Sequence, residues 1–104
     1  MVFNLNTKLN VKSWQMVSVG TINLYRDWEI LRPAVATLAY GIVVAHNHPS
    51  GETSPSPADL DMTRRVRDGA KMLDIVLTDH VIIGKKDGNG NQQAYYSFRE
   101  AGYL

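Results

Sequence analysis

The hydrophobic and polar positions near the start of the chain predict two strands. They cover residues 1–5 and 11–19, and the polar Asn-Thr-Lys stretch at residues 6–8 is typical of the turn of a hairpin. Residues 41–46 form a short apolar run with β-branched residues at its centre, which predicts a buried strand. The first half of the chain is therefore expected to supply several strands of a sheet.

Apolar residues at helical spacing predict two helices. The first covers residues 27–40, where Pro33 fits only in the first helical turn. Its expected buried face comprises Ile30, Leu31, Ala34, Val35 and Leu38. The second begins at residue 57 and ends near residue 73, and the side chains available for packing are Leu60, Met62, Val66, Ala70 and Leu73.

The last third of the chain predicts further strands. Residues 75–77 and 80–84 are apolar enough for strands, and the Asp-Gly-Asn-Gly-Asn turn at residues 87–91 precedes a last strand at 94–98. Helices interspersed with strands predict an α/β (α+β) fold in which helices sandwich a mixed β-sheet. The chain has 104 residues and no internal repeat or linker, so we expect a single domain over residues 1–104.

Composition narrows the classes of function. The chain has no cysteine, which excludes disulfides and thiolate zinc sites and fits a reducing compartment. It has neither a long apolar run nor a start that resembles a signal peptide, so we expect a soluble cytoplasmic protein. The net charge of +1 argues against a strongly basic nucleic-acid surface. The second predicted helix does carry cations, but acidic residues dilute them: Arg64, Arg65, Arg67 and Lys71 against Asp61, Asp68 and Asp74.

The strongest chemical signal is a set of four residues at fixed intervals. His46 and His48 are separated by one residue, seven residues separate His48 from Ser56, and two more separate Ser56 from Asp59. Alternate residues of a strand project from the same face, so the two imidazoles are expected side by side. Ser56 fits a helix N-cap, Pro57 the first helical position and Asp59 the first turn. The intervening loop can therefore fold the carboxylate back over the imidazoles.

Two histidines and one carboxylate are typical of a catalytic zinc site. Structural zinc usually has four protein ligands, whereas three leave a position for water, whose pKa zinc lowers to about 7. The pattern therefore predicts Zn²⁺ bound by His46, His48 and Asp59, with hydrolysis as the reaction class. Two simpler interpretations stay open, because Ser-x-x-Asp before an apolar helix is also a capping box and His-x-His is often a surface pair.

These residues resemble a known family. The pattern of His-x-His, seven residues, Ser, two residues and Asp is the JAMM motif of the JAB1/MPN/Mov34 metalloenzymes, and His-Asn-His-Pro-Ser-Gly at residues 46–51 is similar to the RadC-like branch. Similar landmarks follow the same order at residues 20–21, 29–30, 63–65, 79–84 and 97–104. The resemblance implies a JAB/MPN-like fold with a cytidine-deaminase-like topology. It also implies a zinc metallopeptidase that acts on peptide or isopeptide bonds.

The resemblance further implies roles for individual residues. The three predicted ligands match those of the family, and Ser56 would donate a hydrogen bond to the developing oxyanion or to the bound water. JAMM enzymes also carry an upstream glutamate as general acid and base. The matching position here is Gln15, whose amide cannot take a proton from water. Glu29 and Glu52 are the alternative carboxylates.

Asp79 and His80 form a second pair of interest. An outer carboxylate or carbonyl usually orients a ligand imidazole, so this pair would fit beside the metal. The commoner interpretation is a histidine whose hydrogen bonds are satisfied at a strand end.

Two classes of function follow from this pattern. In the first, the domain hydrolyses a peptide or protein substrate. In the second, it is a non-catalytic module that keeps the fold and the metal site and associates with nucleic acid, since RadC-like proteins carry a DNA-repair label; fold alone does not fix function. The string His-Asn-His also spells the name of a nuclease class, but those nucleases spread the three residues over a hairpin and a helix, so the match is a coincidence.

Overall fold

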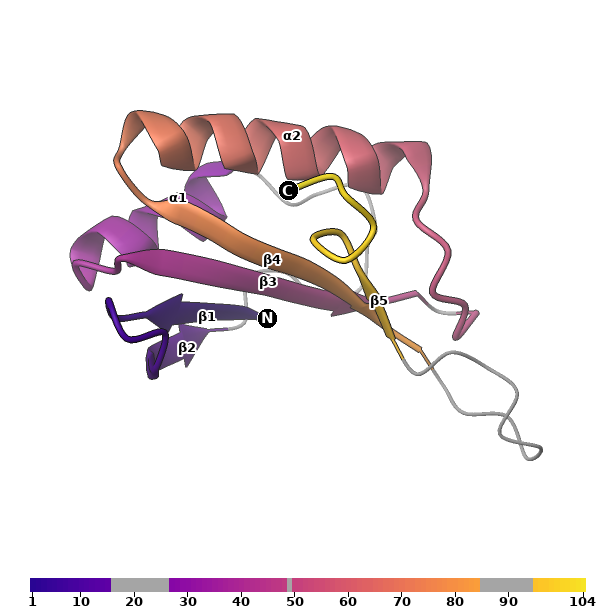
Figure 1. Cartoon of the computed structure of the whole chain (residues 1–104), viewed down its shortest axis with the longest axis horizontal. Helices are drawn as coiled ribbons and strands as arrows, with labels where there is room; N and C mark the ends of the chain where they lie inside the picture. The colour runs from indigo at the N-terminus through magenta and orange to yellow at the C-terminus, as the bar shows by residue number, and fades with distance from the viewer. Residues whose placement is uncertain (16–26, 49, 85–94) are drawn as a thin grey trace.

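The chain begins with a β-hairpin, as its sequence predicts (Figure 1). The structure is a computed structural model that describes residues 1–15, 27–48, 50–84 and 95–104. The elements in these residues are, in chain order, β1 (Val2–Leu5), β2 (Val11–Gln15), α1 (Asp27–Ala36), β3 (Gly41–Asn47), α2 (Pro57–Met72), β4 (Val76–Ile83) and β5 (Tyr95–Ser97).

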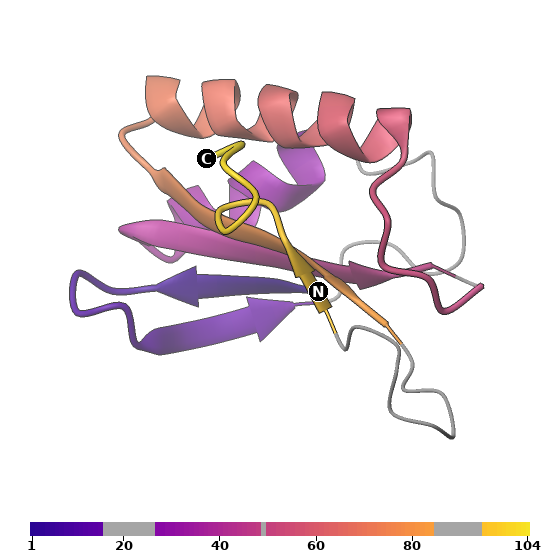
Figure 2. The ribbon, with the colours of Figure 1, turned by 45° about the vertical axis from the view of Figure 1, so that its right-hand side comes forward.

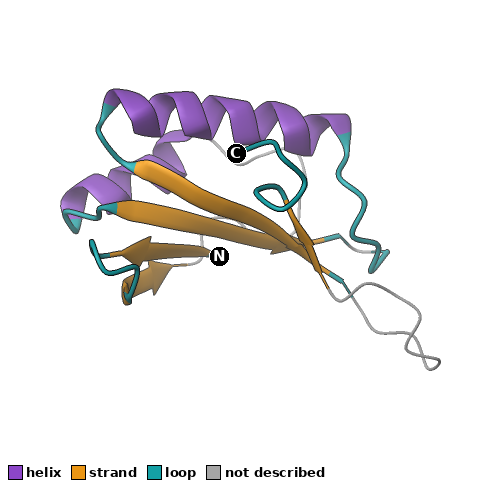
Figure 3. Cartoon of the chain, in the orientation of Figure 1, coloured by secondary structure: helices purple, strands orange, loops and turns teal. Residues whose placement is uncertain are grey.

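The strands form one mixed sheet of five strands in the order β2-β1-β3-β4-β5. β1 pairs antiparallel with both β2 and β3, β3 pairs parallel with β4, and β4 pairs antiparallel with β5. Figure 3 shows the strands side by side with α2 running above them. The predicted α/β (α+β) class with a mixed sheet is therefore confirmed.

Both described helices cover the same face of the sheet (Figure 2). α1 connects β2 to β3 and α2 connects β3 to β4, and both connections run between parallel strands in the same direction across the sheet. Right-handed crossovers of this kind place their helices on one face. Among the described residues the expected sandwich is thus a single layer of helices on one face of the sheet. The sequence could not predict this, because the apolar stripe of a helix does not reveal which side of the sheet the helix covers.

The core fills the space between the helices and this face. Ile30 and Ala34 of α1 and Val66 of α2 meet Ile42 and Val44 of β3, and each of these side chains is at most 1% exposed. Burying one large aliphatic side chain contributes about 1.5–3 kcal/mol. The core therefore holds β3, which carries His46 and leads into His48, against α2, which carries the motif carboxylate.

α1 ends at Ala36 rather than at the predicted residue 40. Leu38 has a φ of 55°, its N–H bonds to the carbonyl of Val35, and the N–H of Ala39 bonds to the carbonyl of Ala34. This is a Schellman C-cap, and it turns the chain away from the helix axis. The predicted burial of Leu38 is wrong for this reason, since it is 85% exposed. The predicted burial of Val35 is also wrong, since Val35 lies within α1 and is 48% exposed. Pro33 lies inside the helix rather than in its first turn.

The other element boundaries follow the sequence more closely. α2 covers nearly the whole predicted range, although Leu73 at its C-cap is 49% exposed and does not enter the core. The two strands expected at residues 75–77 and 80–84 are one continuous strand, β4. Residues 16–19 of the second predicted strand and the turn at residues 87–91 lie outside the described residues. No helix in the described part of the chain has the length and apolar character needed to cross a membrane.

Candidate metal centre

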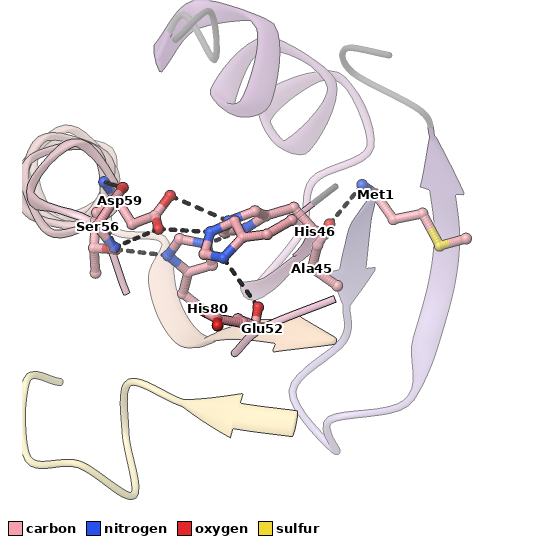
Figure 4. Close-up of polar contacts among 9 residues, drawn as sticks. Met1, Ala45, His46, Glu52, Ser56, Asp59 and His80 are labelled. Atoms are coloured by element: carbon pink, nitrogen blue, oxygen red, sulfur yellow. Dashed lines mark hydrogen bonds and ion pairs between the residues drawn. The ribbon is translucent and has the colours of Figure 1, made fainter. Parts of the chain in front are cut away.

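β3 carries His46 to the end of the sheet that faces the start of α2 (Figure 4), and His48 follows directly after the strand. The strand ends at Asn47, whose side chain is exposed. His46 and His48 on either side of it have side chains that are only 8% and 12% exposed. The predicted alternation is confirmed, and both imidazoles approach Asp59.

The start of α2 is a capping box, as its sequence predicts. The Ser56 Oγ accepts a hydrogen bond from the Asp59 N–H at 3.1 Å, and the Asp59 Oδ2 accepts one from the Ser56 N–H at 2.8 Å. Pro57 occupies the start of the helix. The second of these bonds fixes the orientation of the Asp59 side chain, which is 4% exposed. The capping role and the ligand role are therefore compatible, because the cap aims the carboxylate.

The donor atoms lie close enough to share one cation. The Asp59 Oδ1 is 3.1 Å from the His46 Nε2, and the Asp59 Oδ2 is 2.9 Å from the His48 Nε2. One donor atom from each of the three residues lies within 4.8 Å of the other two. Two atoms bound to one zinc ion at the tetrahedral angle lie about 3.4 Å apart. The three residues therefore fit a metal ion with little movement of the side chains.

The outer hydrogen bond of His48 fixes the tautomer of its ring. The His48 Nδ1 lies 3.1 Å from the backbone carbonyl of Glu52, which can only accept, so Nδ1 carries a hydrogen. In a neutral imidazole the other nitrogen, Nε2, then has a lone pair, and this lone pair faces an oxygen of Asp59. Two acceptors at 2.9 Å repel unless a proton or a metal ion lies between them. The pair is thus arranged to hold a cation.

His46 makes a different outer contact. Its Nδ1 lies 2.8 Å from the Nε2 of His80, which is 1% exposed and stacks on the ring of Phe98. The His80 Nδ1 lies 2.6 Å from the hydroxyl of Thr63. Of the predicted pair of Asp79 and His80, the histidine is therefore beside a ligand. The carboxylate is not, because Asp79 accepts hydrogen bonds from the Ser97 hydroxyl and from backbone N–H groups.

Burial sets the protonation of the site. It lowers the pKa of His46, and the Asp59 carboxylate raises that pKa by less. Burial also lowers the pKa of His80 to about 3, with the neighbouring His46 as the next cause. For Asp59, burial alone would raise the pKa, but hydrogen bonds with Ser56 and the charge of His46 outweigh it and hold the pKa below its usual value. Neutral imidazoles beside an ionised carboxylate are the form that binds a metal ion.

The metal-free protein is expected to lose stability as the pH falls below about 6.5. The pKa of His80 is about 3 in the folded protein and 6.5 at its ordinary value, so between these values the unfolded chain binds a proton that the folded chain does not. Stability is therefore complete above this window and decreases within it, by about 2 kcal/mol between pH 7 and pH 5. Urea unfolding at the two pH values measures the loss. Between pH 7 and pH 5 a His80→Phe variant should lose clearly less stability than the natural chain. An equal loss in both proteins would contradict the claim that His80 causes the pH dependence.

Comparison with known families and proteins agrees with the motif. Residues 1–103 match the family model of the RadC-like JAB domain. The chain belongs to this family. Its relatives include UPF0758 proteins of Chlorobium luteolum, at 40% identity, and of Chlorobium chlorochromatii and Thermotoga maritima, both at 38%. Each match covers 99% of this chain and 44% of the relative, so this RadC-like JAB domain spans less than half the length of these proteins.

In the RadC-like JAB domain, the half-buried Gln15 lies beside the fully buried Asn4. The sheet register aligns Gln15 with Val2 and Val44, on the face that carries His46 but two strands away from β3. The Gln15 Oε1 accepts a hydrogen bond from the Asn4 Nδ2 at 2.8 Å. Its predicted catalytic role stays a prediction, since the side chain contacts Asn4 rather than the three ligands.

The alternative carboxylates and one additional residue complete the site. Glu29 lies half-buried on α1, and the side chain of Glu52 is exposed. The sequence analysis included Thr63 only in the family landmark at residues 63–65 and gave it no role at the site. Thr63 lies one helical turn after Asp59 and donates a hydrogen bond to its carbonyl at 2.7 Å. The spacing of four residues along one helix face was the available signal. It is weak alone, because every helix contains many such pairs.

Proposed function

We propose that this RadC-like JAB domain is a zinc-dependent hydrolase of the JAMM type that acts on peptide or isopeptide bonds. The observation that carries the proposal is the convergence of His46, His48 and Asp59 within 4.8 Å, with the lone pair of His48 aimed at the carboxylate. The family membership supports the same reading of the site. The chain has no cysteine, and the three residues supply imidazole nitrogens and a carboxylate oxygen, both of which bind zinc.

Zinc in such a site supplies Lewis acidity and lowers the pKa of water to about 7, which makes hydrolysis feasible at neutral pH. The protein residues would divide the remaining work. The two imidazoles and Asp59 bind the cation, and the Ser56 hydroxyl, fixed at the N-cap of α2, donates a hydrogen bond to the oxygen of the carbonyl under attack. Gln15 can orient a water molecule or a substrate amide but cannot accept a proton. We therefore expect the natural chain to hydrolyse its substrate slowly.

Chelation is expected to abolish hydrolysis. Purified domain with added zinc would be tested on fluorogenic peptides and on isopeptide-linked pairs, before and after treatment with a chelator. We expect cleavage of at least one class to fall to the uncatalysed rate and to return when zinc is restored. A His48→Ala variant, which removes one ligand, should remain inactive after zinc is restored.

The non-catalytic alternative predicts a different outcome. Binding to DNA that ignores the chelator, together with no cleavage of any substrate, would favour a nucleic-acid-associated module. The charges of α2 do not favour it, since exposed Arg64 and Arg67 alternate with exposed Asp61 and Asp68, and the Arg67 Nε lies 3.2 Å from the Asp68 carboxylate.

A further inference from the structure

Two buried side chains outside the motif connect two of the proposed ligands. The connection runs from the His46 ring to His80, from His80 to the Thr63 hydroxyl, and from Thr63 to the backbone carbonyl of Asp59. The three distances are 2.8, 2.6 and 2.7 Å. β3, β4 and α2 each contribute to this connection. It therefore joins the strand that carries one ligand to the helix that carries another.

Counting hydrogens assigns a direction to each bond. Thr63 has one hydroxyl hydrogen, and it is donated to the carbonyl of Asp59, which has none to give. The hydroxyl must then accept from the His80 Nδ1, so this nitrogen carries a hydrogen. In a neutral His80 the Nε2 is left as an acceptor and takes a hydrogen bond from the His46 Nδ1. The His46 Nε2 consequently presents its lone pair toward Asp59, 3.1 Å away.

The surroundings hold this arrangement rigidly. His80 and Thr63 are 1% and 3% exposed, so water does not compete for their hydrogen bonds. The His80 ring stacks on Phe98 with a centroid distance of 4.5 Å and an interplanar angle of 6°. Packing therefore fixes the plane of the His80 ring, and the Thr63 hydroxyl fixes which nitrogen carries its hydrogen.

We propose that His80 and Thr63 are positioning residues that hold His46 with a hydrogen on Nδ1 and the Nε2 lone pair directed at the cation. A carboxylate, a backbone carbonyl or water usually accepts the outer hydrogen of a ligand imidazole, and here a buried neutral imidazole does so. The connection ends on a backbone carbonyl, which has no proton to pass on, so it orients groups and does not conduct protons. This inference rests on the proposed function, because it concerns the same cation.

Substitutions at Thr63 test the proposal without replacing any of the proposed ligand residues. Thr63→Val keeps the shape but removes the acceptor of the His80 hydrogen, which frees His80 to carry its hydrogen on Nε2 and to donate to His46. The lone pair of His46 then moves to Nδ1, away from the cation. We expect zinc affinity, measured by competition with a chromophoric chelator, to fall about 10- to 100-fold. Thr63→Ser keeps the hydroxyl and should restore affinity to within a few fold of the natural chain.

Substitution of His80 gives a second and independent comparison. His80→Phe removes the acceptor and keeps a ring against Phe98, and it should weaken zinc binding about 10- to 100-fold. Adding Thr63→Val to His80→Phe should cause little further loss, because Thr63 is proposed to act through His80. Additive losses in the double variant would indicate two separate structural effects and would overturn the proposal. If His80→Phe fails to fold, the Thr63→Val and Thr63→Ser pair decides alone.

The hydrogen position itself can be observed without any metal. A long-range ¹H–¹⁵N spectrum of the metal-free protein reports which ring nitrogen of His46 carries hydrogen. We expect Nδ1 in the natural chain and in Thr63→Ser, and a shift toward Nε2 in Thr63→Val. The same spectrum in all three proteins would overturn the inference, even if zinc binding is confirmed. Failure of the natural chain to bind zinc, with the expected spectra, would instead reject the proposed function.

Discussion

Replacing Asp59 with alanine is expected to lower zinc affinity about 100-fold or more. Residues that merely support metal ligands already contribute about 10- to 100-fold, and Asp59 supplies a ligand atom and the only negative charge within the proposed ligand set. The two imidazoles would remain, but they leave half of a tetrahedral shell to water. Competition with a chromophoric chelator measures the affinity, and elemental analysis of the purified variant measures the zinc that it retains.

A matched control separates the ligand role of Asp59 from its capping role. Ser56→Ala removes the capping bond that the Ser56 Oγ accepts, at a cost of about 1 kcal/mol of stability, and keeps the bond from the Ser56 backbone N–H that orients the Asp59 carboxylate. It should therefore be less stable and still bind zinc with nearly natural affinity. Asp61→Ala, which changes an exposed carboxylate on the same helix, should alter neither property. Equal zinc content in Asp59→Ala and the natural chain would remove Asp59 from the ligand set.

Gln15→Glu is expected to raise the rate of hydrolysis about 100- to 10,000-fold, the usual contribution of a positioned general base. The local structure suits the change. The Asn4 amide that now donates to the Gln15 Oε1 can donate to a carboxylate in the same place. The amide Nε2 of Gln15 is buried and makes no hydrogen bond with the residues that the structure describes, so its replacement by oxygen breaks no hydrogen bond there. Steady-state rates on the best substrate of the zinc-loaded protein measure the effect.

The gain should depend on the carboxylate and on the metal together. Gln15→Met, of similar length and without a polar end, should show no increase. Gln15→Glu treated with a chelator should show none either. An unchanged rate in zinc-loaded Gln15→Glu would mean that position 15 does not face the reacting water. Glu52 or a base supplied by the substrate would then be the proton acceptor to consider.

The parts of the site that local rules govern could be predicted from the sequence. The alternation of a strand brings His46 and His48 to one side, and an N-cap followed by proline fixes the start of α2 and hence Asp59. Both rules act over a few residues. The structure adds that the Asp59 carboxylate accepts the capping bond and approaches His48 at the same time. Sequence reasoning had treated the cap and the ligand as competing interpretations.

The contacts that join distant segments could not be predicted in this way. His46 and His80 meet because β3 and β4 pair in parallel, and the register of that pairing has no local signature. Thr63 becomes important only once α2 lies over β4. The predicted end of α1 at residue 40 was wrong for a related reason. A leucine in the left-handed region, as at residue 38, is an uncommon C-cap, and the apolar pattern of the sequence gives no sign of it.

X-ray absorption at the zinc edge of the zinc-loaded protein tests the central claim most directly. The account predicts one bound zinc ion per chain with only nitrogen and oxygen neighbours and with the outer scattering of two imidazole rings. In Asp59→Ala the bound fraction should collapse under the same conditions. A protein that binds no zinc, or a spectrum without imidazole scattering, would contradict the claim that these two histidines and this carboxylate hold a metal ion.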